Sequence, residues 1–266
     1  MKTPSSINNI ANYDTTINII GGLKDCDVIY KAIDSFFSQD DSFHDMLANR
    51  NEFNLRTERS RTRIERAVNR AFLQFRNQNH QNLLKYFLLH SAPWLNRELV
   101  LFWQFALNNQ LFFDISLYVF TKIYFSGRAG ISKDDIIAYL KEFLSENKAL
   151  DLQWSESTIN TISTKYLNFM TKLNLLEGAR KKTFRHIKIS AEMLMIFLYF
   201  SQIYNPDNKD ILTNGLLPLS FVAPEDIQER LKKIALKGWF EMNSNGVTVN
   251  IELTHSYKGI HDVLSH

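Results

Sequence analysis

The sequence is poor in cysteine, glycine and proline, and each shortage excludes a class of protein. Its 266 residues contain one cysteine, Cys26, with nine glycines and five prolines. A single cysteine cannot form a disulfide framework or a cysteine-based zinc site, and it is typical of a reducing compartment. All-β sandwiches use many glycines and prolines in turns, so the low counts favour a mainly helical chain. With 45% hydrophobic and 22% charged residues, the chain can bury a core, which excludes bulk disorder.

Long apolar runs are also missing from the sequence. The longest, Met193 to Phe200, has eight residues, whereas a membrane-spanning helix needs about 20. The first twenty residues hold one lysine and no apolar segment of the kind found in secretory signals. These observations predict a cytoplasmic protein that does not cross a membrane.

The motifs of common catalytic and cofactor sites are absent as well. There is no GxxxxGKS/T or GxGxxG phosphate loop, no HExxH zinc motif and no GxSxG nucleophile turn. The seven histidines are scattered without the spacing of metal ligands. We therefore expect a non-enzymatic protein with no catalytic residues, no metal and no cofactor.

Positive charge, although only +3 overall, is concentrated in two parts of the chain. Residues 50–76 carry eight arginines and three glutamates, net +5, and residues 151–190 carry seven basic and three acidic side chains, net +4. The two ends are acidic: residues 1–49 come to −4 and residues 191–266 to −3. Such segregation indicates a surface that binds a polyanion. The alternative is that the basic segments pair with the acidic ends of the same chain.

The first basic segment has the pattern of an amphipathic helix over residues 57–76. Apolar residues from Ile64 to Phe75 recur at the helical period and predict its buried face. Four arginines spaced i, i+4, i+7, i+11 fall within about 60° of one another on the opposite side. Like charges stacked in this way destabilise an isolated helix, so we interpret them as a phosphate-binding stripe. The stripe comprises Arg59, Arg63, Arg66 and Arg70.

The second basic segment follows the order of a winged helix-turn-helix. A helix starting at Ser132, a short loop, a helix starting at Ser155 or Ser157 and a basic hairpin follow one another. The outward face of the second helix predicts groove or phosphate contacts, and the hairpin predicts contacts beside it. The face carries Thr161, Lys165, Asn168 and Lys172, and the hairpin carries Arg180, Lys181, Lys182, Arg185 and Lys188. An ordinary solvated helix face is the alternative for this pattern.

These patterns predict three parts in a mainly α-helical chain. Residues 1–130 are expected to form a helical domain, in which residues 80–126 form two helices whose aromatic side chains belong to the core. Residues 131–190 form the winged-helix-like module with the basic hairpin. Residues 191–266 form a second, less basic winged-helix-like module, with a hairpin turning at the NSNG sequence.

Four segments resemble the BrxA family of bacterial BREX phage-exclusion systems. They are YDTTINIIGGL, ANRNEFNLRTERSRTRIERAVNRAFLQF, WSESTINTISTKYLNFMTKLNLLEG and GWFEMNSNGVTVNIEL, which together extend from about residue 13 to 253. The resemblance implies a helical N-terminal part similar to the NusB fold, binding of DNA without catalysis, and work alongside other BREX components.

The residues and the resemblance together predict a non-enzymatic accessory protein that binds double-stranded DNA in phage defence. Its partners would be duplex DNA and other BREX components. Two alternatives stay open: an RNA-binding protein, suggested by the NusB-like analogy, and a scaffold whose basic segments bind acidic surfaces of partner subunits.

Overall fold

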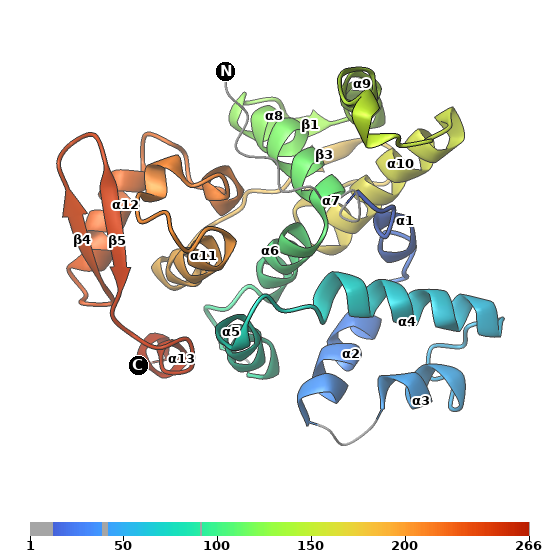
Figure 1. The fold of residues 1–266 in the computed structure, drawn as a ribbon, viewed down its shortest axis with the longest axis horizontal. Coiled ribbons are helices and arrows are strands. Elements are labelled where there is room, and N and C mark those ends of the chain that lie inside the picture. The colour runs from blue at the N-terminus through green and yellow to red at the C-terminus, as the bar shows by residue number, and fades with distance from the viewer. Residues whose placement is uncertain (1–12, 39–41, 91, 266) are drawn as a thin grey trace.

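The computed structural model describes residues 13–38, 42–90 and 92–265, and this part of the chain is mainly helical (Figure 1). The first half contains α1 (Ile17–Ile20), α2 (Asp27–Ser38), α3 (Phe43–Ala48), α4 (Glu58–Phe72), α5 (Gln78–Leu89), α6 (Arg97–Asn108), α7 (Gln110–Ile115), the π-helical turn η2 (Ser116–Phe120) and α8 (Thr121–Phe125). The second half contains β1 (Gly130–Ile131), α9 (Lys133–Glu146), η3 (Lys148–Leu150), α10 (Glu156–Lys172), β2 (Leu176–Glu177), β3 (Lys182–Phe184), α11 (Ala191–Tyr204), η4 (Ile211–Thr213), η5 (Leu217–Ser220), α12 (Ile227–Ala235), β4 (Phe240–Ser244), β5 (Val249–Leu253) and α13 (Ile260–Leu264). The prediction of a mainly helical chain with short antiparallel hairpins is confirmed.

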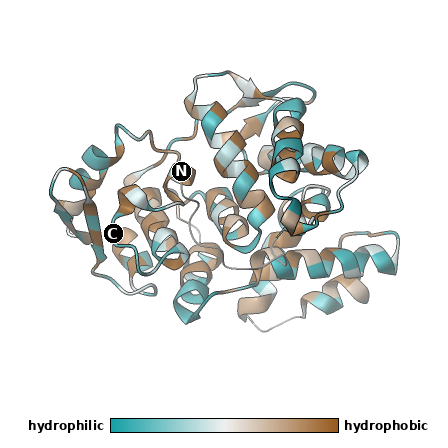
Figure 2. Cartoon of the chain, turned by 45° about the horizontal axis from the view of Figure 1, so that its top comes forward, coloured by the Kyte–Doolittle hydropathy of each residue, from teal (hydrophilic) through white to brown (hydrophobic). Residues whose placement is uncertain are grey.

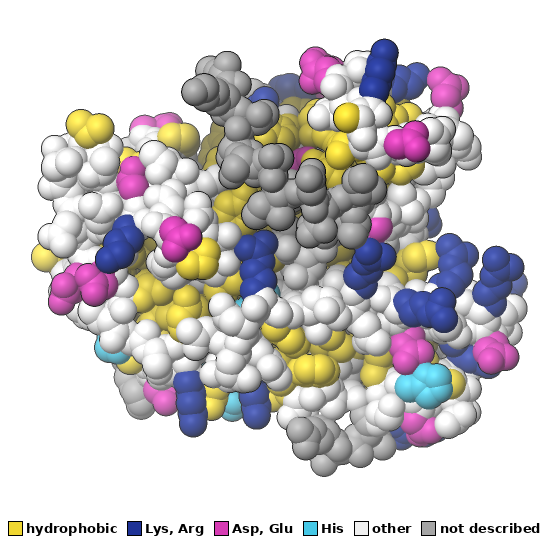
Figure 3. All heavy atoms as spheres, viewed as in Figure 1, with side chains coloured by type: hydrophobic (Ala, Val, Ile, Leu, Met, Phe, Trp, Pro, Cys, Tyr) yellow, Lys and Arg dark blue, Asp and Glu magenta, His cyan; other side chains and the backbone are white. Residues whose placement is uncertain are grey.

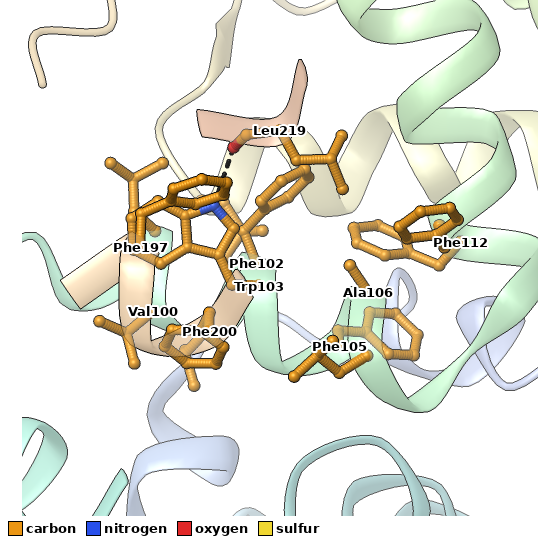
Figure 4. Packing of buried hydrophobic residues seen from close by; sticks show 14 of the residues in the cluster. Val100, Phe102, Trp103, Phe105, Ala106, Phe112, Phe197, Phe200 and Leu219 are labelled. Atoms are coloured by element: carbon orange, nitrogen blue, oxygen red, sulfur yellow. Dashed lines mark hydrogen bonds between the residues drawn. The ribbon is translucent and has the colours of Figure 1, made fainter. Parts of the chain in front are cut away.

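Helix α6 lies at the centre of the molecule and is buried on all sides. Every residue from 99 to 107 is buried. Trp103 packs against Phe197 and Phe200 of α11, with ring centroids 5.5 Å apart in both pairs, and its Nε1 donates to the Leu219 carbonyl at 2.8 Å (Figure 4). The aromatic residues of this region therefore belong to the core, as the sequence predicted.

The prediction of two helices over residues 80–126 is wrong, because the region contains α5, α6, α7, η2 and α8. Asn109 is one cause of the division. Its extended backbone ends α6, while its side-chain oxygen accepts from the backbone N–H of Phe112 at 2.8 Å and so caps α7. An asparagine suits this position because its short polar side chain caps helices well.

A buried polar network joins α5 to α6. The His80 ring is fully buried, and its Nε2 lies 2.6 Å from Oε1 of Gln104. The Gln104 amide nitrogen donates to the carbonyls of Phe72 and Gln74, so its oxygen must accept from His80. The other ring nitrogen, Nδ1, accepts from the Arg76 backbone N–H at 3.2 Å. Nε2 therefore carries a proton and Nδ1 does not, which is a neutral form of the ring. Burial lowers the pKa of His80 to about 4.

Residues 130–184 fold as strand, two helices and a hairpin. The strand order in the sheet is β1-β3-β2, and both pairings are antiparallel. Helix α9 starts with a capping box between Ser132 and Asp135, and α10 starts at Ser155, whose side chain accepts from the Thr158 N–H. These starts agree with the sequence analysis, and α9 packs directly on α10.

The C-terminal part also ends in an antiparallel hairpin but does not repeat this order, because η4, η5 and α12, rather than two α-helices, lie between its edge segment at Asp210 and the hairpin. Helix α11, the short turns η4 and η5, and α12 precede the β4–β5 hairpin, in which Phe240 pairs with Leu253. A bridge between Asp210 and Asn250 adds a third segment beside β5, and the Ile251 N–H donates to the carbonyl of residue 209 at 3.1 Å. The segment before η4 thus takes the place that β1 takes in the preceding sheet.

The parts of the chain share one core. Helix α11 packs on α5 and α12, and α1 packs on both α4 and α10. Figure 1 shows α1 between these two helices, and Figure 2 shows the apolar sides of the helices turned toward one another. Arg76, at the end of the segment after α4, donates to the last carbonyls of α11, those of Ile203 and Tyr204, at 3.1 and 2.9 Å. Distant segments are thereby tied at their helix ends.

Candidate nucleic-acid interface

Helix α4 presents three exposed arginines that no described residue neutralises. The helix begins where the Thr57 side chain accepts from the Ser60 N–H, and its buried face is formed by Ala67, Val68, Ala71 and Phe72. Arg59, Arg63 and Arg66 are exposed on the other side, without a hydrogen bond or ion pair to the described part of the chain. Figure 3 shows the basic side chains gathered over α4 at the right of the view.

Arg70, the fourth predicted member of the stripe, has a partner within the protein. Its Nε lies 2.8 Å from Oδ2 of Asp14. Asp14 is itself held, because its Oδ1 accepts from the Thr16 N–H at 2.7 Å and from the Asn109 amide at 2.9 Å. Arg70 therefore anchors the segment before α1, and the stripe offers its charge chiefly through the other three arginines.

Glu65, which lies between Arg63 and Arg66 in the sequence, is engaged elsewhere. Its carboxylate lies 3.0 Å from Nδ1 of His44 in α3. No ion pair joins it to an arginine of α4 among residues 13–38, 42–90 and 92–265. The positive charge of the exposed arginines is therefore not cancelled within the helix.

The outward face predicted for α10 lies against α1. Lys172 is half-buried, and its Nζ donates to the Gly21 carbonyl at 2.9 Å. A side-chain carbon at Gly21 would collide with the backbone of Lys165, so only glycine permits this approach of the two segments. Thr161 donates to the carbonyl of Ser157, one turn earlier. Lys172 and Thr161 thus bond within the protein and the Lys165 backbone packs on Gly21, while the Lys165 ammonium group and the Asn168 side chain form no hydrogen bond or ion pair with a described residue.

The basic hairpin divides into anchored and unanchored side chains. Lys182 donates to the Gly178 carbonyl at 2.7 Å, and Arg185 lies 3.3 Å from the carboxylate of Glu177 and 3.2 Å from the side-chain oxygen of Asn174. The other three basic residues are exposed and form no ion pair with any described residue. These are Arg180, Lys181 and Lys188.

The segment from Gly22 to Lys24 lies between the two basic regions. Arg63 of α4 and this segment line the same cavity. On the other side, Nζ of Lys165 comes within 3.4 Å of the position that a side-chain carbon at Gly22 would take. Burial lowers the pKa of Lys172, and the positive charges of Lys165 and Lys182 lower it further. The end of α10 lies beside the hairpin. Residues 22–24 lie between Lys165 of α10 on one side and Arg63 of the stripe on the other.

Sequence analysis missed the cover that α1 provides for α10. The contact joins residues 151 positions apart, and periodicity along one helix cannot reveal it. The adjacent glycines at positions 21 and 22 are the only sequence signal, because paired glycines allow close approach of two backbones.

The described residues show neither a metal site nor a membrane-spanning helix. They bring together no group of three or more histidine, cysteine, aspartate or glutamate side chains that could hold a metal ion. Across the same residues, every helix is too short or too polar to cross a bilayer. Cys26 is buried, and burial raises the pKa of its thiol to about 12, so it lacks the character of a reactive thiolate.

Over the described residues, the protein is a mainly helical fold with two small antiparallel sheets and an exposed arginine face on α4. The sequence model of the BrxA family matches residues 29–197, and the chain belongs to this family. Membership places it among the components of BREX phage-defence systems, and the family is generally regarded as non-catalytic. No curated protein and no solved structure matches the chain.

Proposed function

We propose that this protein is a non-enzymatic component of a BREX system that binds double-stranded DNA through its phosphate backbone. The observation that carries the proposal is the exposure of Arg59, Arg63 and Arg66 on one face of α4 without a neutralising partner in the described structure. Arginine is the side chain best suited to phosphate, since its planar fork donates two parallel hydrogen bonds.

The spacing of the three arginines fits a DNA strand. From the first to the last there are seven residues, which is about 10 Å along a helix that rises about 1.5 Å per residue. Each strand of B-DNA carries one phosphate for about every 3.4 Å of the duplex axis, so a stripe aligned with that axis spans about three phosphates of one strand. Backbone contacts of this kind position a protein but read no sequence.

The element order of residues 130–184 supports a winged-helix assignment for this module. In such modules the second helix usually enters the major groove. Here α1 lies on the corresponding face of α10, which leaves few side chains for base contacts. We therefore assign binding to the α4 arginines together with Arg180, Lys181 and Lys188 of the hairpin, and we expect little sequence specificity.

The proposal is tested by binding of the purified chain to a fluorescent random 30-bp duplex at several salt concentrations, with structured RNA as competitor. Six unanchored cations predict a log–log slope of about −5, at about −0.9 per phosphate contact. Duplex binding with this slope that resists RNA would support the proposal. Displacement of the duplex by structured RNA would favour the alternative of an RNA-binding protein. No binding at low salt, together with co-purification of another system component, would favour a scaffold.

A further inference from the structure

A cavity of about 650 Å³ lies beside the arginine stripe, enclosed by three separate segments. One wall is the chain between α1 and α2, the second is the loop before α4, and the third is the first turns of α4. The volume falls within the range of about 300–1,000 Å³ that is usual for small-molecule sites. It is much larger than an ion needs.

The loop that forms the second wall is held in a defined shape. Asn51 and Asn54 adopt left-handed backbone conformations, which asparagine tolerates better than most residues. The Asn51 side chain donates to the Leu55 carbonyl and accepts from its N–H, at 3.1 and 2.8 Å, and Arg61 also donates to that carbonyl at 3.2 Å. The wall is therefore preorganised, which reduces the entropy lost on binding.

Phe53 provides an aromatic surface in this wall. The ammonium group of Lys31 lies 5.3 Å from the ring centroid, and the same Nζ bonds to Glu52 at 2.9 Å. These contacts fix the ring beside the aliphatic side chains of Ile19 and Ile64, which also line the cavity. Aromatic and aliphatic walls of this kind suit a planar ring such as a nucleobase.

The polar groups of the cavity carry both signs of charge. Arg63 and Lys24 are exposed cations without an ion pair to the described residues, and they suit a phosphate. Asp25 and Asp27 also line the cavity, and carboxylates accept hydrogen bonds from ribose hydroxyls. A simple anion would be repelled by the acids, and a purely apolar ligand would leave all four charges without a partner.

Asn18 adds an unpaired acceptor to the same cavity. Its Oδ1 is buried and has no hydrogen-bond partner among the described residues. An orphaned buried acceptor costs free energy unless a ligand supplies a donor. The exocyclic amines of adenine, cytosine and guanine are such donors. Uracil and thymine also donate, through their ring N–H, so the ring that isolates the amine is unsubstituted purine, whose nucleotide has adenine's ring system but no N–H on the base.

We propose that this cavity binds one nucleotide whose base carries an exocyclic amine, with its phosphate at Arg63 and Lys24. The nucleotide comes either from solution or from an unpaired position of a nucleic-acid strand. The strand source rests on the DNA binding proposed above, because the strand would be brought in along α4. The solution source is independent of it.

The test is calorimetric titration of the full chain with AMP and with purine riboside 5′-monophosphate, which lacks the amine, alongside titration with a blunt duplex and with the same duplex carrying a three-nucleotide adenine overhang. Two variants address the site: Asn18→Leu removes the acceptor at similar volume, and Ser60→Trp fills the cavity from the exposed first turn of α4. Ser145→Trp, at an exposed position of α9 outside the cavity lining, is the matched control. Thermal unfolding checks the fold of each variant.

For a free nucleotide we expect AMP to bind at least about tenfold more tightly than purine riboside 5′-monophosphate, and this preference to disappear in Asn18→Leu without a lower melting temperature. Ser60→Trp should abolish binding, and Ser145→Trp should leave it unchanged. For a strand source, the overhang duplex should bind more tightly than the blunt duplex by a similar factor, again only with Asn18 and Ser60 intact.

The proposal is overturned if AMP does not bind and the overhang gives no advantage, or if either effect persists unchanged in Ser60→Trp. Equal affinity for AMP and purine riboside 5′-monophosphate would overturn it as well, because the amine would then not be recognised. Binding of the blunt duplex tests the proposed DNA binding separately. If AMP binds but the blunt duplex does not, only the proposed DNA binding is refuted.

Discussion

Replacing Arg63 and Arg66 should change how steeply DNA binding depends on salt. Both side chains are exposed on α4 and have no partner among the described residues, so removing them leaves no buried charge unpaired. Glutamine is a good helix former, and it keeps much of the side-chain length while removing the charge. The double variant Arg63→Gln/Arg66→Gln therefore tests the phosphate contacts rather than the stability of the helix.

The size of the effect follows from the number of unanchored cations. Six phosphate contacts give a log–log slope of about −5.4, and four contacts give about −3.6. Between 50 and 200 mM salt, the affinity of the natural sequence should fall by about a thousandfold, and that of the double variant by only about a hundredfold. The charge reversal Arg63→Glu/Arg66→Glu should abolish detectable binding at 100 mM salt.

The assay is fluorescence anisotropy with a random 30-bp duplex at four or more salt concentrations. Helical circular dichroism must be the same for all variants. Lys85→Gln/Lys232→Gln is the matched control, because it removes two exposed charges from α5 and α12, far from the stripe in sequence. If the arginine variant keeps the slope and affinity of the natural sequence, α4 is not the contact surface and the reasoning is refuted.

Three further predictions concern stability and reactivity. The pKa of His80 is about 4 in the folded protein and 6.5 in the unfolded chain, so the unfolded chain takes up a proton at a higher pH than the folded one. The neutral His80 ring therefore contributes fully to the free energy of unfolding above pH 6.5, and this free energy falls by about 3 kcal/mol as the pH drops to 4. Urea unfolding across this range, compared with His80→Gln, should show a flatter dependence in the variant; parallel curves would contradict the assignment. Gly21→Ala should lower stability by about 1–3 kcal/mol, because the new methyl group meets the backbone of Lys165; an unchanged melting temperature would show that α1 can move away from α10 without cost. Cys26, with its thiol pKa raised to about 12, should resist a disulfide reagent at pH 8 until denaturant is added; rapid labelling of the folded chain would place the thiol at the surface.

Local patterns in the sequence predicted helices and caps well. The capping box at Ser132, the start of α10 at Ser155 and the amphipathic α4 all depend on residues within a few positions of one another. The exposure of the arginine face follows from the same periodicity. These features are encoded locally, and the fold leaves them unchanged.

Contacts between distant segments decide the remaining features, and the sequence does not display them. Arg70 meets Asp14 from a segment that lies 56 positions earlier, and Lys172 meets the carbonyl of Gly21. Both residues match the spacing of their predicted faces, yet each bonds within the protein. Spacing identifies a face of a helix, but packing determines which members of that face reach solvent.

The all-round burial of α6 has a consequence for synthesis on the ribosome. One aromatic residue of this helix, Trp103, is covered by Phe197 and Phe200 of α11, which follows about ninety residues later in the chain. A growing chain that has released α6 but not yet α11 exposes Trp103 and its neighbours to water. Such surfaces are aggregation-prone and are the surfaces that chaperones bind. Truncation before α11 would leave Trp103 in that state, whereas loss of α13 would leave Trp103 covered by α11.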